Sequence, residues 1–278
     1  LKAGFEVRRL HLPSLQQSNA RGQITFRASS TGASTGYTFA DFLIGLPGSS
    51  QEVPVKSPIL LKQSELASYI QDDWRITSRL TLNLGLRHEL LLNPYEERNR
   101  LAMFDAGHGA IVVASDDGKL PLAEFLPAVV KKLTDAQGKW RFPLLSDKEA
   151  GFNPRRLVDT QYKHWGPRFG LVYQAGAQGR TVVRGGYGIF YTRYPIQYLL
   201  QTVAVNPPFA GLFTHSQQIQ SGQPALTLEA PYASAGASAS VSPAGLQHDF
   251  TLPDNQQWNL TTEHDLGWGT ALSLGYVG

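Results

Sequence analysis

The chain has 278 residues, no cysteine and a formal net charge of +3 at pH 7. The absence of cysteine excludes a disulfide framework and a thiolate metal site, and the small, dispersed charge argues against nucleic acid as a partner. Since the sequence has no apolar run of about 18 residues or more, it predicts no transmembrane helix.

Strand-like patterns run along the chain from its first residues, whereas helix signals are few. Residues 40–46 predict a short helix or a buried turn, and residues 122–133 have some helical periodicity, although Pro127 lies in their middle. Two prolines interrupt the strand pattern of residues 53–62, which is the weakest strand signal of the chain. We predict further strands over residues 1–9, 23–28, 66–76, 80–91, 167–174, 180–191, 257–266 and 270–277.

The clearest strand pattern lies in residues 66–91. Leucine occupies positions 80, 82, 84 and 86, Thr81, Asn83 and Gly85 alternate with these leucines, and Arg87 and Glu89 continue the polar side. A period of two indicates a strand with one apolar and one polar face. Only residues 77–79 separate it from the preceding strand, so the two strands predict an antiparallel hairpin. Its apolar face either covers a core or contacts lipid.

The later strands repeat this two-faced pattern. One face collects apolar side chains, and the other carries the Arg, Glu, Gln, Asn and Gly residues that suit a wet lumen. A soluble sandwich would also alternate, with its apolar face turned inward. The apolar side chains of these strands are Phe169, Leu171, Tyr173, Val183, Tyr187, Ile189, Tyr191, Trp258, Leu260, Leu272, Leu274 and Tyr276.

Trp74, Trp258 and Trp268 are assigned to positions at or near the short turns. Amphipathic rings favour the boundary between membrane and water, so these residues are candidates for an interfacial girdle. The alternative is that they pack a soluble core.

The connections alternate between short and long. Residues 77–79, 175–179 and 267–269 are short links, whereas residues 92–166 and 192–256 form long ones, and residues 30–63 a third. Outer-membrane barrels have tight turns on the periplasmic side and long loops outside. The long links are polar, and residues 221–245 are close to low complexity, so we expect mobile loops on the outer surface. The residue patterns leave a transmembrane barrel and a soluble sandwich both open.

Several segments resemble one family. Residues 69–89 read YIQDDWRITSRLTLNLGLRHE, which resembles a hairpin of TonB-dependent outer-membrane receptors, especially the Oar-like branch with a carboxypeptidase-regulatory-like N-terminal domain. Similar stretches follow the family's order and span residue 39 to the end. They read FADFLIGLP at 39–47, GPRFGLVYQ at 166–174, RTVVRGGYGIFY at 180–191, NPPF at 206–209, and QQWNLTTEHDL with ALSLGYVG within 256–278.

The resemblance favours the barrel, so the fold class predicted is an all-β, antiparallel transmembrane β-barrel segment with short periplasmic turns and long extracellular loops. It implies a whole barrel of 22 strands, plugged by an N-terminal domain and energised by the inner-membrane TonB complex. Residues 1–278 would then be a partial barrel domain of eight or nine strands, and we expect the plug domain, the TonB box and the closing C-terminal strand to lie outside it. The implied location is the outer membrane of a Gram-negative cell. The implied partners are outer-membrane lipid, the TonB complex through the missing N-terminal part, and an unknown external ligand.

We find no catalytic constellation, metal-ligand spacing or cofactor motif, so the chain is not expected to be an enzyme or to hold a cofactor. The candidates for lining the channel are Arg87, Glu89, Arg168 and Arg184. The alternative for each is ordinary barrel structure, in which these groups bond to one another or to the plug.

Three functions remain open. The first is part of a TonB-dependent transporter that binds and takes up an external ligand. The second is a structural or adhesive surface barrel without transport, which the absence of a plug and TonB box from the full-length protein would favour. The third is a soluble carbohydrate-binding β protein, which predicts water solubility and paired acidic residues across a cleft. A small closed barrel of eight strands is also compatible with the length.

Overall fold

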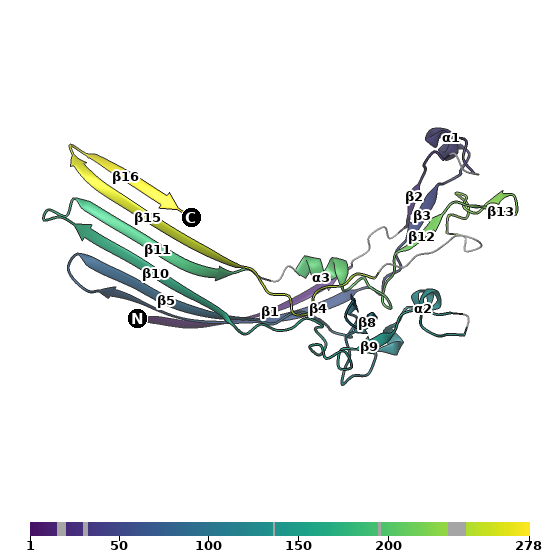
Figure 1. Ribbon diagram of the computed structural model, residues 1–278, viewed down its shortest axis with the longest axis horizontal. Helices are drawn as coiled ribbons and strands as arrows, with labels where there is room; N and C mark the ends of the chain where they lie inside the picture. Colours follow the sequence, from purple (N-terminus) through teal and green to yellow (C-terminus); the bar gives the residue numbers. More distant parts are fainter. Residues whose placement is uncertain (16–20, 30–32, 136, 194–195, 233–242) are drawn as a thin grey trace.

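The computed structural model describes residues 1–15, 21–29, 33–135, 137–193, 196–232 and 243–278 (Figure 1). Its largest element is an eight-stranded sheet with the order β1-β4-β5-β10-β11-β15-β16, in which the short strand β6 also pairs with β4. The strands are β1 (Lys2–Ser14), β4 (Ile59–Arg75), β5 (Leu80–Leu91), β6 (Tyr95–Glu96), β10 (His164–Ala175), β11 (Thr181–Tyr191), β15 (Asp254–Gly267) and β16 (Thr270–Val277).

All neighbouring strands of this main sheet are antiparallel. The three short turns, β4 to β5, β10 to β11 and β15 to β16, lie at the same end of the sheet (Figure 1). Within the described residues β1 and β16 form two open edges, so the sheet is a wall segment. The predicted hairpins are confirmed, and the fold is an all-β, antiparallel segment of a barrel.

Strand boundaries differ from expectation in the first third of the chain. The strand predicted at residues 53–62 does not exist separately, because its second half is the beginning of β4, which starts directly after Pro58. Proline has no N–H to donate to a ladder, so it marks where the pairing can begin. The segment predicted at residues 23–28 is strand only over β2 (Gln23–Thr25), and β2 pairs outside the main sheet with β3 (Ser49–Glu52).

The helices are short. The predicted helix at residues 40–46 appears as α1 (Thr38–Leu43), and the one at residues 122–133 divides at its proline into η1 (Leu122–Glu124) and α2 (Pro127–Leu133). Proline fits the first turn of a helix, where an N–H has no partner inside the helix, so α2 begins with it. A further helix, α3 (Ile196–Thr202), lies in a link where none was predicted. No helix among the described residues is long and apolar enough to cross a membrane.

The described parts of the long links are folded, in contrast to the mobile loops expected from sequence. They form what we call the outer region, the described residues among 21–58, 92–163 and 196–253, beyond the end of the sheet that lacks the short turns (Figure 1). Residues 233–242 of the low-complexity stretch lie outside the described residues. The small strands of the outer region are β7 (Ala102–Asp105), β8 (Ala110–Val113), β9 (Leu144–Ser146), β12 (Phe213–Ser216), β13 (Ile219–Gln220) and β14 (Gln223–Pro224).

The outer region has a hydrophobic core that is continuous with the main sheet. Leu101, Met103 and Val112 are fully buried, and they cluster with Ile59 of β4 and Leu91 of β5. The ends of β4 and β5 that lie away from the short turns are therefore packed in a core of the kind found in water-soluble proteins. This shared core fixes the outer region onto one end of the wall.

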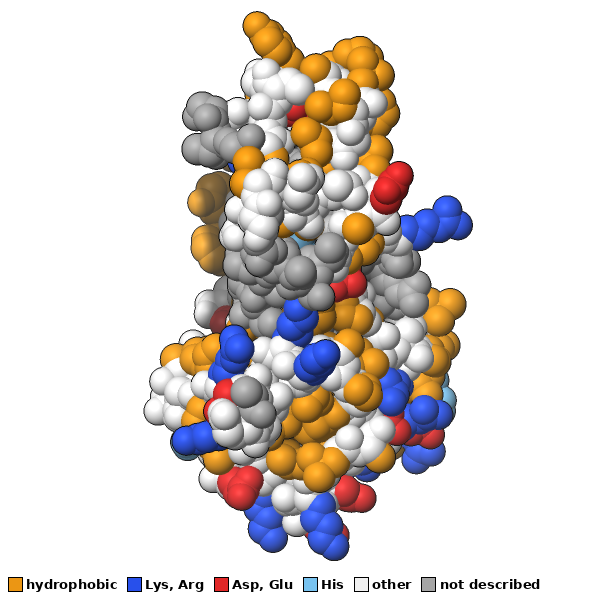
Figure 2. Space-filling model, turned by 90° about the vertical axis from the view of Figure 1, so that its right-hand side faces the viewer, with side chains coloured by type: hydrophobic (Ala, Val, Ile, Leu, Met, Phe, Trp, Pro, Cys, Tyr) orange, Lys and Arg blue, Asp and Glu red, His pale blue; other side chains and the backbone are white. Residues whose placement is uncertain are grey.

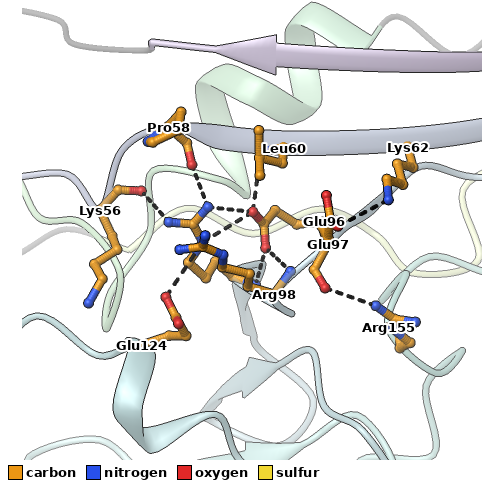
Figure 3. Close-up of polar contacts among 10 residues, drawn as sticks. Lys56, Pro58, Leu60, Lys62, Glu96, Glu97, Arg98, Glu124 and Arg155 are labelled. Atoms are coloured by element: carbon orange, nitrogen blue, oxygen red, sulfur yellow. Dashed lines mark hydrogen bonds and ion pairs between the residues drawn. The ribbon is translucent and has the colours of Figure 1, made fainter.

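A buried ion pair lies at that junction (Figure 3). The Arg100 guanidinium lies 2.7 Å from the Glu96 carboxylate, and both side chains are almost completely buried. Glu96 also accepts hydrogen bonds from the backbone N–H groups of Arg98 at 2.7 Å and of Leu60, in β4, at 3.2 Å. Arg100 donates to the Lys56 carbonyl at 3.1 Å. A buried charge is tolerated only when it is paired and hydrogen-bonded, and here the partners come from residues 56–60 and 96–100.

Candidate functional site: the two faces of the sheet

The strand register separates the main sheet into two faces. Residues directly opposite each other in an antiparallel ladder point to the same side, so each cross-strand row belongs to one face. One row consists of Lys2, Gln71, Gly85, Arg168, Gly188 and Gln257. The next row consists of Asp72, Leu84, Phe169, Tyr187 and Trp258. We call the sides that these rows represent the polar face and the apolar face.

The apolar face exposes large hydrophobic side chains on every long strand. A continuous patch of this size is unusual on a soluble monomer and marks contact with another apolar medium. Of its acidic or basic residues, Asp72 and His264 lie within three residues of the turn ends Arg75 and Gly267, while Arg9, Lys62 and His88 lie toward the other end of the sheet. The exposed set includes Phe5, Val7, Ile70, Trp74, Leu84, Leu86, Trp165, Phe169, Tyr173, Tyr187, Trp258, Leu260, Leu272, Leu274 and Tyr276.

The tryptophans mark two levels of this face rather than one. Trp74 is next to the last residue of β4, and Trp268 lies in the turn between β15 and β16. Trp258, in contrast, lies nine residues before Gly267, the end of β15. At about 3.3 Å per residue and a tilt of about 40°, that separation corresponds to about 23 Å of depth, close to the ~25 Å apolar band of such barrels. The prediction that Trp258 lies at or near a short turn is therefore wrong. Trp258 lies on the apolar face at the level away from the short turns.

Trp165 was missed by sequence reasoning and lies at a comparable level to Trp258, ten residues before Ala175 in β10. Its ring stacks on His88 with a centroid distance of 4.2 Å. The predicted strand began at residue 167, yet the alternation of Phe169 and Pro167 on the apolar face continues to Trp165. Extending the period of two by one further step would have found it.

The polar face carries three of the four predicted channel residues as ion pairs. Arg87 lies 2.6 Å from Glu89 on the same strand and 3.5 Å from Glu6 of β1. Arg184 lies 2.6 Å from Glu263 of β15. These contacts agree with the structural alternative, in which lumen-side charges bond to one another.

A network extends from Arg87 toward the outer region. Glu6 contacts Arg8 at 3.2 Å, Arg8 contacts Glu65 at 3.6 Å, and Glu65 contacts Arg193 at 3.3 Å. The sequence did not single out Glu6, Arg8 or Glu65, because only the pairing of β1 with β4 brings them together. Connected charges of this kind hold geometry better than isolated surface pairs.

Arg168 differs from the other three residues. Its guanidinium lies over the ring of Phe190, 4.9 Å from the ring centroid, and it makes no ion pair with a carboxylate of the described residues. It borders a cavity of about 240 Å³ together with Tyr69, Gln71 and Arg87. The charge of Arg168 is therefore not balanced by a carboxylate neighbour in the described part of the chain.

The outer region presents a second exposed feature. Tyr37, Phe39, Leu43 and Ile44, in and beside α1, are exposed at the end of the outer region far from the sheet. Figure 2 shows hydrophobic side chains gathered at the top of the molecule, the height at which Figure 1 places α1. Asp41 fixes this segment by accepting hydrogen bonds from the Ser34 hydroxyl at 2.6 Å and the Thr35 amide at 2.6 Å. The Ser34 hydrogen bond is the main cause that lowers the pKa of Asp41 below its usual value.

No three His, Asp or Glu side chains of the described residues gather in a way that could hold a metal ion. Glu263 and Asp265 lie on the polar face, while His264 lies on the apolar face, where it contacts the Thr181 hydroxyl at 2.8 Å. This arrangement agrees with the strand geometry, which separates consecutive side chains.

Comparison with known proteins gives one match. A family model described as "Outer membrane beta barrel domain" matches residues 1–278. No curated protein and no solved structure matches the chain.

Proposed function

The chain belongs to the outer-membrane β-barrel domain family, and from that premise we propose that it is part of a TonB-dependent transporter, which binds an external ligand and takes it up with energy from the inner membrane. The protein resides in the outer membrane, and its main sheet is barrel wall. In the proposed arrangement the apolar face contacts lipid and the polar face lines a water-filled lumen.

The observation that carries this proposal is the polar face. Its charged residues from β1, β4, β5, β11 and β15 are joined into ion pairs, with Arg87, Glu89 and Arg184 among them. A wall of this kind suits a wide, hydrated interior rather than a packed one. The hairpin of β4 and β5 also carries the sequence that resembles TonB-dependent receptors, which is the basis for naming the energy source. Arg87, Glu89, Arg168 and Arg184 are proposed to face the lumen.

The test uses the full-length protein purified in detergent. We expect the periplasmic domain of TonB from the same organism to bind it in a biosensor measurement, through an N-terminal plug domain outside residues 1–278. A matched protein that lacks the first segment of that plug should not bind. If the intact protein gives no binding, and cells without TonB retain its activity, the transport proposal is wrong.

A second function is favoured by one specific observation, the exposed apolar residues beside α1. A structural or adhesive barrel would use such a surface to contact other material outside the cell. Replacing Phe39 and Leu43 by serine should then abolish adhesion of cells that display the protein, whereas TonB should have no effect. The soluble carbohydrate-binding alternative is not retained, because the chain belongs to an outer-membrane family and its apolar face is exposed.

A further inference from the structure

We propose that Arg168 and the open basin around it bind a carboxylate group of a solute inside the lumen. This inference rests on the proposed function, since it names the chemical class of ligand that the lumen would accept. It goes beyond a lining role, because it assigns ligand contact to Arg168 and a structural role to Arg87 and Arg184.

The first argument is the distribution of charge. Arg87 has two carboxylate neighbours, Glu89 and Glu6, and Arg184 has Glu263. The Arg168 guanidinium instead lies over the Phe190 ring, which leaves its fork of N–H donors without a carboxylate among the described residues. A guanidinium presents paired donors that match the two oxygens of a carboxylate, and such bidentate contacts are among the strongest hydrogen bonds in proteins.

The second argument is space. The cavity of about 240 Å³ beside Tyr69, Gln71 and Arg87 opens next to Arg168, and a smaller one of about 60 Å³ lies between Arg168, Glu89 and Phe190. Pockets for whole drug-sized ligands are about 300–1,000 Å³. The larger cavity therefore fits a small dicarboxylate, or one acidic group of a larger ligand.

The third argument is the surface beneath the cavity. The residues on both sides of Arg168 in its cross-strand row are glycines, Gly85 and Gly188, and the amide side chains of Gln71 and Gln257 follow them, with Lys2 of β1 beyond Gln71. A side chain at Gly188 would begin 3.0 Å from the Phe190 ring and would displace the ring from Arg168. Glycine in a strand permits close approach of another group to the backbone. Around Arg168 the row thus combines an open surface with amide hydrogen-bond donors, and a second cation, Lys2, lies at its β1 end.

The amide groups favour a solute that also accepts hydrogen bonds from neutral donors, as a carboxylate does. Tyr69, opposite Arg87 on β4, adds a hydroxyl to the same cavity. We therefore expect recognition by one strong charge-assisted contact to Arg168 and by weaker neutral contacts around it.

The test is ligand-detected NMR titration of the full-length protein in detergent micelles, with succinate as the probe and succinamide as its uncharged match. Succinate should bind and succinamide should not. Arg168→Gln should weaken succinate binding about tenfold or more, because a hydrogen bond to a charged group is lost. Arg168→Lys should restore part of the affinity.

Two further variants separate the site from general charge and from folding. Arg184→Gln removes an equal charge from the same face and should change succinate affinity by less than about twofold, since Arg184 is held by Glu263. Gly85→Leu keeps Arg168 and fills the basin, and its Cβ would meet only an ordinary contact of 3.5 Å to Arg168 Cβ, so the protein should fold and still lose binding. The thermal unfolding midpoint verifies folding of each variant.

Equal affinity of the wild type and Arg168→Gln would overturn the inference, as would an equal loss in Arg168→Gln and Arg184→Gln. Failure of the wild type to bind succinate would also overturn it. That result would indicate that an acidic side chain elsewhere in the protein forms an ion pair with Arg168. This titration contains no TonB. Loss of TonB binding alone would therefore contradict the transport proposal and leave the carboxylate site intact.

Discussion

The main sheet and the outer region use the same residue types in opposite ways. On the apolar face of the sheet Leu86 is 40% exposed and Leu274 is 75% exposed, whereas in the outer region Leu101 and Val112 are 0% exposed. Apolar side chains follow the medium around them, and in the proposed arrangement the chain meets two media, lipid beside the sheet and water around the outer region. In that arrangement one continuous polypeptide forms a membrane wall in the main sheet and a water-soluble fold in the outer region.

The two regions also treat ion pairs differently. The Arg100–Glu96 and Arg184–Glu263 pairs have nearly equal lengths, 2.7 Å and 2.6 Å. Their side chains are 2% and 0% exposed in the outer region but 49% and 41% exposed on the sheet. Solvent screens the exposed pair, while the buried pair would leave a bare charge in the core if one partner were removed. Burial of the side chains, rather than the distance between them, therefore decides how much the loss of one partner changes stability.

The largest expected effect comes from breaking the buried pair. Arg100→Ala leaves the Glu96 carboxylate buried without its partner, which should destabilise the outer region by about 3–5 kcal/mol. Hydrogen exchange of the β7 and β8 amides in the full-length protein would report this as faster local opening, with the sheet amides unchanged.

The matched control is Lys62→Ala, which removes a more exposed pair to Glu97 of 3.2 Å at the same junction. It should cost less than about 1 kcal/mol. If the two variants opened the outer region equally, burial would not explain the difference between the two kinds of pair.

The second-largest expected effect distinguishes the two faces of the sheet. Leu86 lies on the apolar face of β5, between Ile70 and Pro167 in the ladder. Leu86→Arg should cost about 2–4 kcal/mol if the side chain lies near the bilayer midplane, and it should lower assembly of the full-length protein in the outer membrane. Asn83→Arg, on the polar face of the same strand, should be much milder. Equal assembly of both variants would contradict the assignment of the faces.

The smallest effect concerns the outer region near α1. The Ser34 hydroxyl and the Thr35 amide lower the pKa of Asp41, so the stabilisation from Asp41 is complete above the unfolded-state pKa of about 4 and disappears as pH falls through the lower folded-state value. A fluorophore on Phe39→Cys should lose anisotropy as the pH is lowered below about 4.

With Asp41→Asn added, the anisotropy should be low at every pH. A flat profile for the protein that retains Asp41, or an unchanged pH dependence in the double variant, would show that this carboxylate does not hold the segment in place.

The alternation of side chains made most of the main sheet predictable. Strands β5, β10, β11, β15 and β16 lie within a few residues of their predicted bounds, because a period of two is a local property of the sequence. The N-terminal part of β4 was harder to assign. Its residues before Leu66 leave the apolar band and join the outer core, so the surroundings of each face change along one strand.

The candidate site was predictable only in part. The four charged residues were found from their side of the strand, yet their partners Glu6 and Glu263 come from β1 and β15, distant in sequence. The isolation of Arg168 depends on which residues lie beside it in the ladder, and the register supplies glycines there. The folded outer region was not predicted, because its core joins segments separated by about a hundred residues, such as Leu101 and Val203.

The orientation of the two faces can be measured most directly with spin labels. The chain contains no cysteine, so Leu86→Cys and Asn83→Cys each create one labelling position within it. In the full-length protein reconstituted in lipid vesicles, a nitroxide at position 86 should be accessible to oxygen and shielded from a water-soluble nickel complex. A nitroxide at position 83 should show the reverse. Shielding of position 86 from both reagents would mean that protein, not lipid, covers the apolar face, and would contradict the account.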